Sequence, residues 1–256
     1  MQQLILVCLS VLSFNNFTSH TTQSSTFESV HEDRVVIGRR RILLVRSPEL
    51  ARQFPKRKTA VVIYPVITGL SNPAVLRRVR STLDFKNIFD YSLKEYREDR
   101  WLTEFTYVVN YNKNYLFDIA FTQSGMSAYP DEQSRHFLIS LKDGHIVRAL
   151  DAFHSDKLAK LTFIVDRELQ REIKKIANEN RDRSEQKEVN GAYENLKFEL
   201  KDLDGFSVGP GGIFFLYDAG FPHVIKALQP QGRYFFTYSA LREYIKPDGP
   251  LGQFVD

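Results

Sequence analysis

Residues 205–246 read GFSVGPGGIFFLYDAGFPHVIKALQPQGRYFFTYSALREYIK, and this stretch decides the class of fold. It contains two apolar runs rich in aromatic residues, at 213–217 and 234–238. Aromatic and β-branched residues favour strands, so both runs are predicted to be strands. The segment between them, 218–230, contains glycine, proline and charged residues and is predicted to be irregular. The chain upstream is therefore expected to build the core on which these strands close.

The same stretch contains GFSVG at 205–209, which matches the G-x-S-x-G pattern of a serine nucleophile. In a hydrolase that serine follows a strand and precedes a helix, and the sharp turn between them exposes its hydroxyl group. Here PGG at 210–212 follows the motif, and then comes an apolar run typical of a strand. The motif is therefore interpreted as a strand that enters a glycine-rich hairpin turn.

The chain before residue 205 combines strand patterns with two amphipathic helix patterns. Asn72 is a typical cap for a helix over 73–83, and apolar residues at spacings of three and four predict a long helix that starts at 155–156. The remaining predictions are strands at 34–46, 59–67, 102–111, 115–122 and 136–141, a turn at 112–114, a polar loop at 124–134, and a hairpin with a left-handed Gly144 that pairs Ile139 with Val147. These patterns predict an α+β fold, in which an antiparallel sheet built of hairpins packs against the long helix and the shorter capped helix. Residues 31–256 are predicted to form a single α+β domain.

The composition is that of an ordinary globular protein. Of 256 residues, 43% are hydrophobic and 26% are charged, which excludes disorder or membrane embedding for the bulk of the chain. Cys8 is the only cysteine, so the folded region has no disulfide, no cysteine-ligated zinc and no thiol nucleophile. His136, His145 and His154 do not have the spacing of a known metal motif. We therefore expect no metal site and no cofactor.

Residues 1–30 resemble an export signal followed by a spacer. The apolar run at 4–14 has the length of a signal-peptide core and is too short to span a bilayer, and a polar tract follows at 15–25. A buried N-terminal strand is the alternative interpretation. With an export signal, the mature chain would be extracytoplasmic, either secreted or periplasmic, and would have no transmembrane segment.

Positive charge is concentrated between residues 31 and 80, where the sequence has twelve Lys or Arg against three Asp or Glu. Such a segment could contact an anionic wall polymer, nucleic acid or lipid headgroups, and of these we expect an anionic polymer. The residues that would contact it are Arg39, Arg40, Arg41, Lys56, Arg57 and Lys58. The alternative is a solvated face, because the charges alternate with Val, Ile and Leu. No nucleic acid is expected as a partner.

The irregular segment between the two aromatic strands is where a binding site is predicted. Tyr217, Asp218, His223 and Lys226 are expected to converge in a groove that binds a polar ligand such as a glycan. The alternative is a structural role, in which Pro222 and His223 shape a buried loop and the imidazole bonds to the backbone.

Several motifs follow one another in a characteristic order from residue 59 onwards. They are TAVVIYPVITGL at 59–70, the capped helix after it, two hairpins, SLKDG at 140–144, DAF at 151–153, the long helix, and FFLYDAGFPHVIKAL…YFFTYSALREYIKPDGPL near the end. In this order they resemble an extracytoplasmic bacterial domain of unknown function, over residues 59–255. That domain is the C-terminal domain of RsiV-type anti-sigma factors and an accessory domain beside the catalytic domain of some peptidoglycan deacetylases.

The resemblance implies a non-enzymatic α+β domain outside the cytoplasm, which in one characterised relative is a receptor for lysozyme. These 256 residues contain neither the sigma-binding region nor the deacetylase domain of those relatives, so their signalling and catalytic roles are not expected here. We therefore expect a secreted or periplasmic binding module that recognises a cell-wall glycan or an envelope protein. Two alternatives stay open: an unrecognised hydrolase that uses His223 with Asp218 or Tyr217, and a structural envelope protein whose basic face contacts an anionic polymer.

Overall fold

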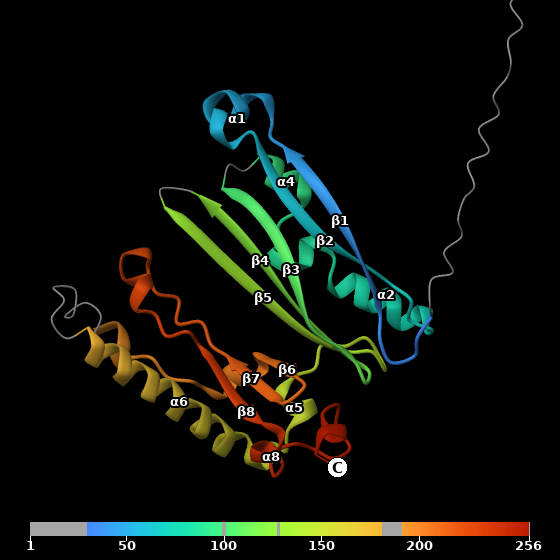
Figure 1. The fold of residues 1–256 in the computed structure, drawn as a ribbon, viewed down its shortest axis with the longest axis vertical. Helices are drawn as coiled ribbons and strands as arrows, with labels where there is room; N and C mark the ends of the chain where they lie inside the picture. Colours follow the sequence, from blue (N-terminus) through green and yellow to red (C-terminus); the bar gives the residue numbers. More distant parts are fainter. Residues whose placement is uncertain (1–29, 99–100, 127–128, 181–190, 256) are drawn as a thin grey trace, which may run out of the picture.

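The computed structural model describes residues 30–98, 101–126, 129–180 and 191–255 (Figure 1). The predicted export signal and spacer lie outside the described residues, apart from Val30. Within the described part of the chain, no helix combines the length and the apolar character needed to cross a membrane. The described residues form two layers, each organised around a β-sheet.

The larger layer is a five-stranded sheet in the order β1-β2-β3-β4-β5. Its strands are β1 (Val36–Val45), β2 (Thr59–Thr68), β3 (Leu102–Lys113), β4 (Leu116–Met126) and β5 (Pro130–Ser140). Neighbouring strands are antiparallel except β2 and β3, which run parallel and pair only at Val61 and Val62 of β2. The predicted α+β class is confirmed. The predicted antiparallel sheet built of hairpins differs from the structure at one strand pair, because a helical connection lies between β2 and β3 and allows them to be parallel.

That connection covers one face of the larger sheet. It contains α2 (Pro73–Thr82), α3 (Phe85–Phe89) and α4 (Leu93–Glu98). The predicted start of the first helix is confirmed, since the Asn72 side chain accepts hydrogen bonds from the N–H groups of Ala74 and Val75. The buried residues of these helices pack in one core with side chains of β3 and β4, among them Phe105, Phe117 and Phe121.

The smaller layer is a three-stranded antiparallel sheet covered by the long helix. Its strands are β6 (Phe206–Gly209), β7 (Gly212–Leu216) and β8 (Arg233–Thr237), and the helix is α6 (Leu158–Glu179). Short helical turns complete the layer: α5 (Ala149–Ala152), η2 (Ser155–Lys157), η3 (Leu200–Asp204), η4 (His223–Leu228), α8 (Tyr238–Leu241) and η5 (Gly252–Phe254). The predicted periodicity of the long helix is confirmed, because Leu161, Val165 and Leu169 are fully buried in a second core with Phe206 and Phe215.

The interpretation of the G-x-S-x-G motif as a strand and a hairpin turn is confirmed. Ser207 lies in β6, pairs with Phe214 of β7 and is 4% exposed. Gly209 pairs with Gly212 across the turn, and the next element is the strand β7 instead of a helix. Ser207 therefore lacks the exposed, strained position of a nucleophile.

The turn between β3 and β4 lies two residues later than predicted. Asn112 and Lys113 belong to β3, and the turn residues are Asn114 and Tyr115, whose φ angles are 54° and 58°. Asparagine tolerates this left-handed region, whereas tyrosine rarely adopts it. A long-range hydrogen bond compensates here, because the N–H group of Tyr115 donates to the carbonyl oxygen of Asp33. The turn was therefore predicted at the wrong position, because local sequence preference does not include this long-range hydrogen bond.

The predicted polar loop at 124–134 is also wrong. β4 continues to Met126 and β5 begins at Pro130, and the two strands pair in this region, for example Ser124 with Glu132. The strand residues are polar because this part of the hairpin extends beyond the hydrophobic core, where alternating side chains meet solvent.

For the hairpin after β5, the predicted turn is confirmed and the predicted strand register is wrong. Gly144 has a φ of 81°, in the left-handed region as predicted. Ile139, however, pairs with Ile146 in an isolated bridge, and the predicted partner Val147 donates its N–H group to Leu138. The returning segment is short because α5 begins at Ala149.

Candidate functional site

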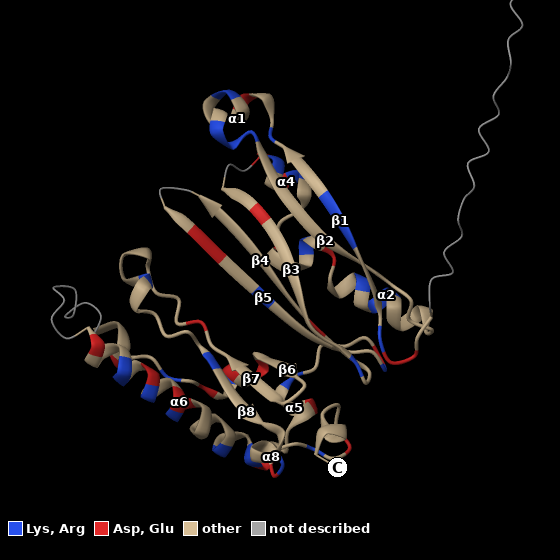
Figure 2. Ribbon diagram, viewed as in Figure 1, with Lys and Arg blue, Asp and Glu red and all other residues tan. Residues whose placement is uncertain are grey.

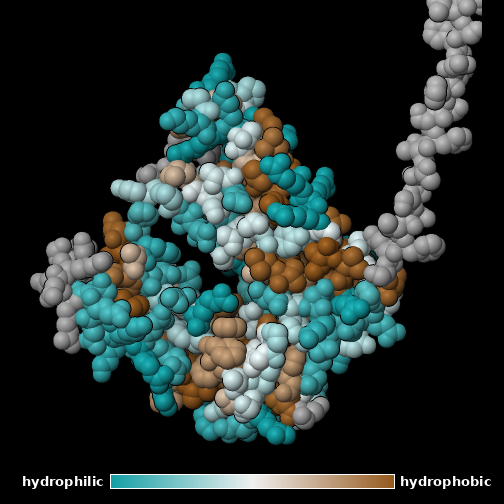
Figure 3. All heavy atoms as spheres, in the orientation of Figure 1, coloured by the Kyte–Doolittle hydropathy of each residue, from teal (hydrophilic) through white to brown (hydrophobic). Residues whose placement is uncertain are grey.

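A cleft of about 730 Å³ lies between the end of the β4–β5 hairpin and η4 of the smaller layer. Figure 3 shows the molecule hollowed between these two parts. The polar and aromatic residues that line the cleft include Ser124, Tyr129, Asp131, Glu132, His223 and Lys226. Figure 1 shows why the space exists: β6 lies close to β3 and β5 at one end of the larger sheet, whereas the opposite end of β4 and β5 projects beyond it.

The two layers meet again at the far end of the cleft through one aromatic contact. The rings of Tyr129 and His223 are stacked, with 4.4 Å between their centroids and 21° between their planes. His223 is exposed, and Tyr129 keeps 57% of its surface exposed. The stack therefore bridges the layers and still presents aromatic surface to a ligand.

The two walls of the cleft differ in charge. On the sheet side, Asp131 and Glu132 begin β5, and the Ser124 hydroxyl donates a hydrogen bond of 3.3 Å to the Glu132 carboxylate. Glu104 of β3 pairs with Ser124 from the other side, and Figure 2 shows these acidic positions on β3 and β5. The η4 side contributes the exposed cation Lys226. A polar ligand would therefore meet acceptors on the sheet wall and a donor on the helical wall.

The structure brings together only two of the four predicted site residues. His223 and Lys226 line the cleft, but Asp218 is used in a local turn: its Oδ1 accepts hydrogen bonds from the Gly220 N–H group and from Nε2 of Gln229. Tyr217 packs against Phe198 on the helical side of the smaller layer, with 5.9 Å between ring centroids. Burial raises the pKa of the Tyr217 hydroxyl.

This placement bears on the hydrolase alternative. Neither Asp218 nor Tyr217 lines the cleft that contains His223. A histidine base needs an orienting partner within hydrogen-bond reach of its ring, whereas the ring of His223 stacks on Tyr129. The geometry therefore provides no support for a catalytic pair in this segment.

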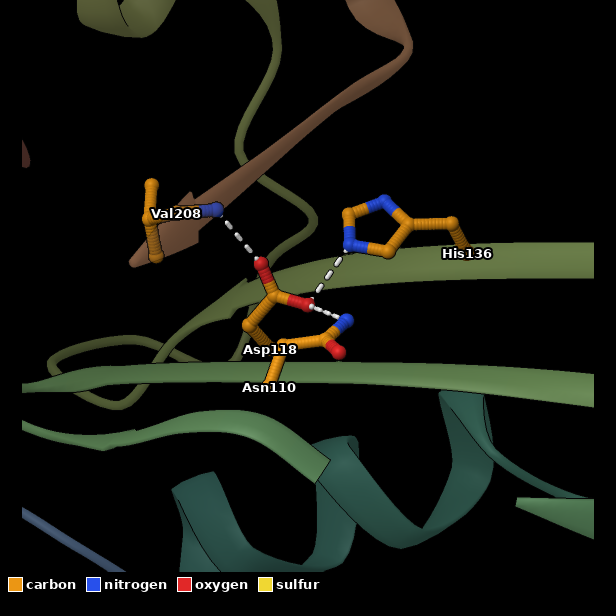
Figure 4. A network of polar contacts seen from close by, with 4 residues as sticks. All are labelled: Asn110, Asp118, His136 and Val208. Carbon is orange, nitrogen blue, oxygen red and sulfur yellow. Dashed lines mark hydrogen bonds and ion pairs between the residues drawn. The ribbon is translucent and has the colours of Figure 1, made fainter. Parts of the chain in front are cut away.

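A second polar cluster lies at the other end of the interface between the layers, and sequence reasoning missed it (Figure 4). The side chain of Asp118, on β4, is 0% exposed. Its Oδ1 accepts a hydrogen bond of 2.8 Å from Nδ2 of Asn110 and lies 2.7 Å from Nε2 of His136. Its Oδ2 accepts a hydrogen bond of 2.7 Å from the N–H group of Val208 in β6. A buried carboxyl group thus ties the smaller sheet to the larger one.

The three histidines that were considered for a metal site are far from forming one. His136 contacts Asp118, and His145 lies 3.4 Å from the Arg78 guanidinium through its Nε2 atom. Among the described residues, no group of three or more His, Cys, Asp or Glu side chains could hold a metal ion.

The described residues form a two-layer α+β fold with an open cleft, lined by both apolar and polar residues, between its layers. No family model matches the chain, and no curated protein matches it. The solved structures that share its fold include two proteins of the DUF3298 family. A member of the DUF3298 family from Bacteroides fragilis NCTC 9343 is 10% identical, with a TM-score of 0.55 over 88% of this chain and 98% of that one. A DUF3298 family protein from Pseudomonas aeruginosa PAO1 is 12% identical, with a TM-score of 0.52 over 84% of this chain and 96% of that one.

At these identities the likeness shows the fold alone. The chain has the fold of a domain of unknown function, which agrees with the expected resemblance to such a domain. The more specific resemblance, to RsiV-type anti-sigma factors and to the accessory domains of deacetylases, stays a prediction.

Proposed function

We propose that the protein is a non-enzymatic, extracytoplasmic binding module that recognises a cell-wall glycan in the cleft between its layers. The observation that carries the proposal is the stack of Tyr129 on His223, which places an exposed aromatic ring beside a row of polar groups. The cleft is of the size that ligand sites in proteins commonly have.

The chemistry of the lining matches the surface of a sugar. A sugar ring has apolar C–H groups on its faces and hydroxyl groups around its edge. The exposed part of Tyr129 can stack on such a face, while the carboxylates of Asp131 and Glu132 accept hydrogen bonds from hydroxyl groups. Lys226 on the opposite wall donates hydrogen bonds to sugar oxygens.

Tyr129→Ala is expected to weaken the binding of soluble peptidoglycan glycan fragments by at least about tenfold, because it removes the aromatic platform. Glu132→Gln is expected to weaken binding several-fold, because a neutral amide replaces a charged acceptor. Calorimetric titration of the purified chain with these fragments measures both effects.

The matched control is Val224→Ala. Val224 lies in η4 next to His223 and is 77% exposed, but it does not line the cleft. This variant is expected to bind the fragments as the unmodified chain does. If the unmodified chain does not bind the fragments, or if it binds an envelope protein through this cleft instead, the glycan proposal is wrong.

The proposed location has its own test. Cell fractionation followed by sequencing of the mature N-terminus is expected to find the chain outside the cytoplasm, starting after the apolar run at 4–14. A cytoplasmic protein that retains Met1 would contradict the export of the chain and, with it, the access to a cell-wall ligand.

A further inference from the structure

The edge strand β1 has one face that is half basic and half aliphatic. Alternation along a strand places residues 39, 41, 43 and 45 on the same face. Arg39 and Arg41 are exposed there, and so are Leu43 and Val45, at 54% and 56%. The neighbouring Leu44 is buried in the core beneath the other face, on the side of α2 to α4. Leu43 and Val45 therefore lie on the face opposite this core, and their side chains are exposed to solvent.

More cations follow at the end of the strand. There the chain forms α1 (Pro48–Gln53) and η1 (Pro55–Arg57) before β2 begins, and Val45 pairs with Thr59. Lys56 and Lys58 are exposed on this connection. Between residues 39 and 58 the sequence has eight Lys or Arg and one Glu, a net charge of +7. Figure 2 shows the cations around α1 and along β1, and Figure 3 shows an apolar patch between hydrophilic ones in the same region.

Two arginines of this segment are engaged inside the protein. Arg46 is 4% exposed and donates hydrogen bonds to the carbonyl oxygens of Tyr96 and Leu102. Arg57 donates to the carbonyl oxygen of Met126. The exposed residues that we group as the β1 surface are Arg39, Arg41, Leu43, Val45, Lys56 and Lys58.

The charges select the occupant of this surface. A second copy of the chain has the same three arginines at 39, 40 and 41, and this excess of like charge opposes edge-to-edge pairing. A soluble anionic polymer would satisfy the cations but would leave Leu43 and Val45 in water. An anionic bilayer satisfies both, because its headgroups attract cations and its acyl boundary accepts aliphatic side chains.

We propose that the β1 surface binds the face of a bilayer that contains anionic lipids. Arg39 and Arg41 on one side, and Lys56 and Lys58 on the other, contact the headgroups. Leu43 and Val45 between them insert at the acyl boundary. The surface lies on the first hairpin of the larger sheet, none of its residues lines the cleft, and the proposal does not depend on glycan binding.

Vesicle co-sedimentation tests the proposal with the unmodified chain. Binding to vesicles of phosphatidylglycerol and phosphatidylcholine is expected to exceed binding to phosphatidylcholine alone, and added salt is expected to weaken it. Equal binding to the two kinds of vesicle, or none to either, would overturn the proposal. Polyphosphate serves as the soluble polyanion: a chain that binds polyphosphate tightly and does not bind the anionic vesicles would also overturn it.

Two double variants separate the two contributions. Arg39→Gln with Arg41→Gln is expected to lower the affinity for anionic vesicles about thirtyfold. Leu43→Thr with Val45→Thr places a β-branched residue that favours strands at both positions and is expected to lower it about tenfold. The controls are Lys174→Gln with Lys175→Gln on α6, and Val224→Thr in η4, which are expected to bind as the unmodified chain does. Full binding by the Leu43→Thr, Val45→Thr variant would overturn the insertion of the aliphatic pair.

A variant that binds more tightly provides a test that a loss of fold cannot imitate. Val45→Trp adds an interfacial aromatic residue at the centre of the β1 surface and is expected to bind anionic vesicles more tightly. Its fluorescence, corrected for the natural Trp101 with the unmodified chain, is expected to shift to the blue and to be quenched by brominated lipids. Tighter binding without quenching would place the contact elsewhere and overturn the proposal.

Discussion

Gly232→Ala is expected to destabilise the protein by more than about 4 kcal/mol, at the upper end of the effects of single substitutions. Gly232 has a φ of 65°, and a Cβ atom there would lie 1.7 Å from the carbonyl oxygen of Tyr217. The backbone cannot move away easily, because the N–H group of Tyr217 donates to the carbonyl oxygen of Gly232 at the start of the β7–β8 pairing. Alanine therefore forces the last two strands apart, and urea unfolding followed by circular dichroism measures the loss.

The chain contains a matched control for this prediction at Gly220. Its φ is 62°, close to that of Gly232, but nothing lies within 4 Å of the position of its Cβ atom. Gly220→Ala therefore meets only the left-handed backbone penalty, about 1–2 kcal/mol. The difference between the two variants isolates the steric conflict with Tyr217. Equal losses would show that backbone preference alone governs both positions.

Elements whose signals are local were predicted well from the sequence. Asn72 caps α2 because its side chain reaches N–H groups two and three residues later, and the apolar spacing of α6 reports which face is buried. The hairpin between β6 and β7 follows from two glycines that flank a Pro-Gly turn. Each signal depends on residues within one or two turns of chain, which is the range over which sequence patterns act.

What sequence reasoning missed depends on contacts between distant residues. The parallel pairing of β2 with β3 requires the whole helical connection between them, and no short pattern encodes it. Tyr129 and Glu132 were assigned to a loop, because an exposed strand and a polar loop have similar compositions. Tyr217 and Asp218 were expected beside His223 because they are close in sequence, whereas the end of β7 directs them to Phe198 and Gln229.

Asp118 is a carboxylic acid residue in the middle of an apolar strand, and its side chain is buried. It lies in LFDIAF, where both chain neighbours and the residues beyond them are apolar. Such a carboxyl group is stable in a core only when hydrogen-bond donors surround it. The donor from β6, the N–H group of Val208, is 90 residues away in the sequence. A single aspartate in a buried strand was therefore a signal that something distant must pair with it, although the partner could not be named.

Asp118→Leu is expected to destabilise the protein by about 3–5 kcal/mol, because it keeps the branched shape of the side chain and removes every acceptor. The side chain of Asn110 is near solvent and that of His136 is 14% exposed, so both can turn to water, but the N–H group of Val208 is buried against β4. Asp118→Asn retains one oxygen and is expected to have a smaller effect, about 2 kcal/mol. Asp131→Asn, at an exposed position on β5, is the control and is expected to change the stability by less than about 0.5 kcal/mol.

The loss caused by Asp118→Leu is also expected to be localised, since the bond that it removes joins the two layers. Amide hydrogen exchange measured by NMR should show that the N–H group of Val208 loses protection, while the amides that pair β7 with β8 keep theirs. Because β6 holds the smaller layer on the larger sheet at this end, its release changes the spacing of η4 from the β4–β5 hairpin and should weaken ligand binding in the cleft, although Asp118 does not line it. Unchanged protection at Val208, with an unfolding midpoint equal to that of the unmodified chain, would show that packing alone joins the layers.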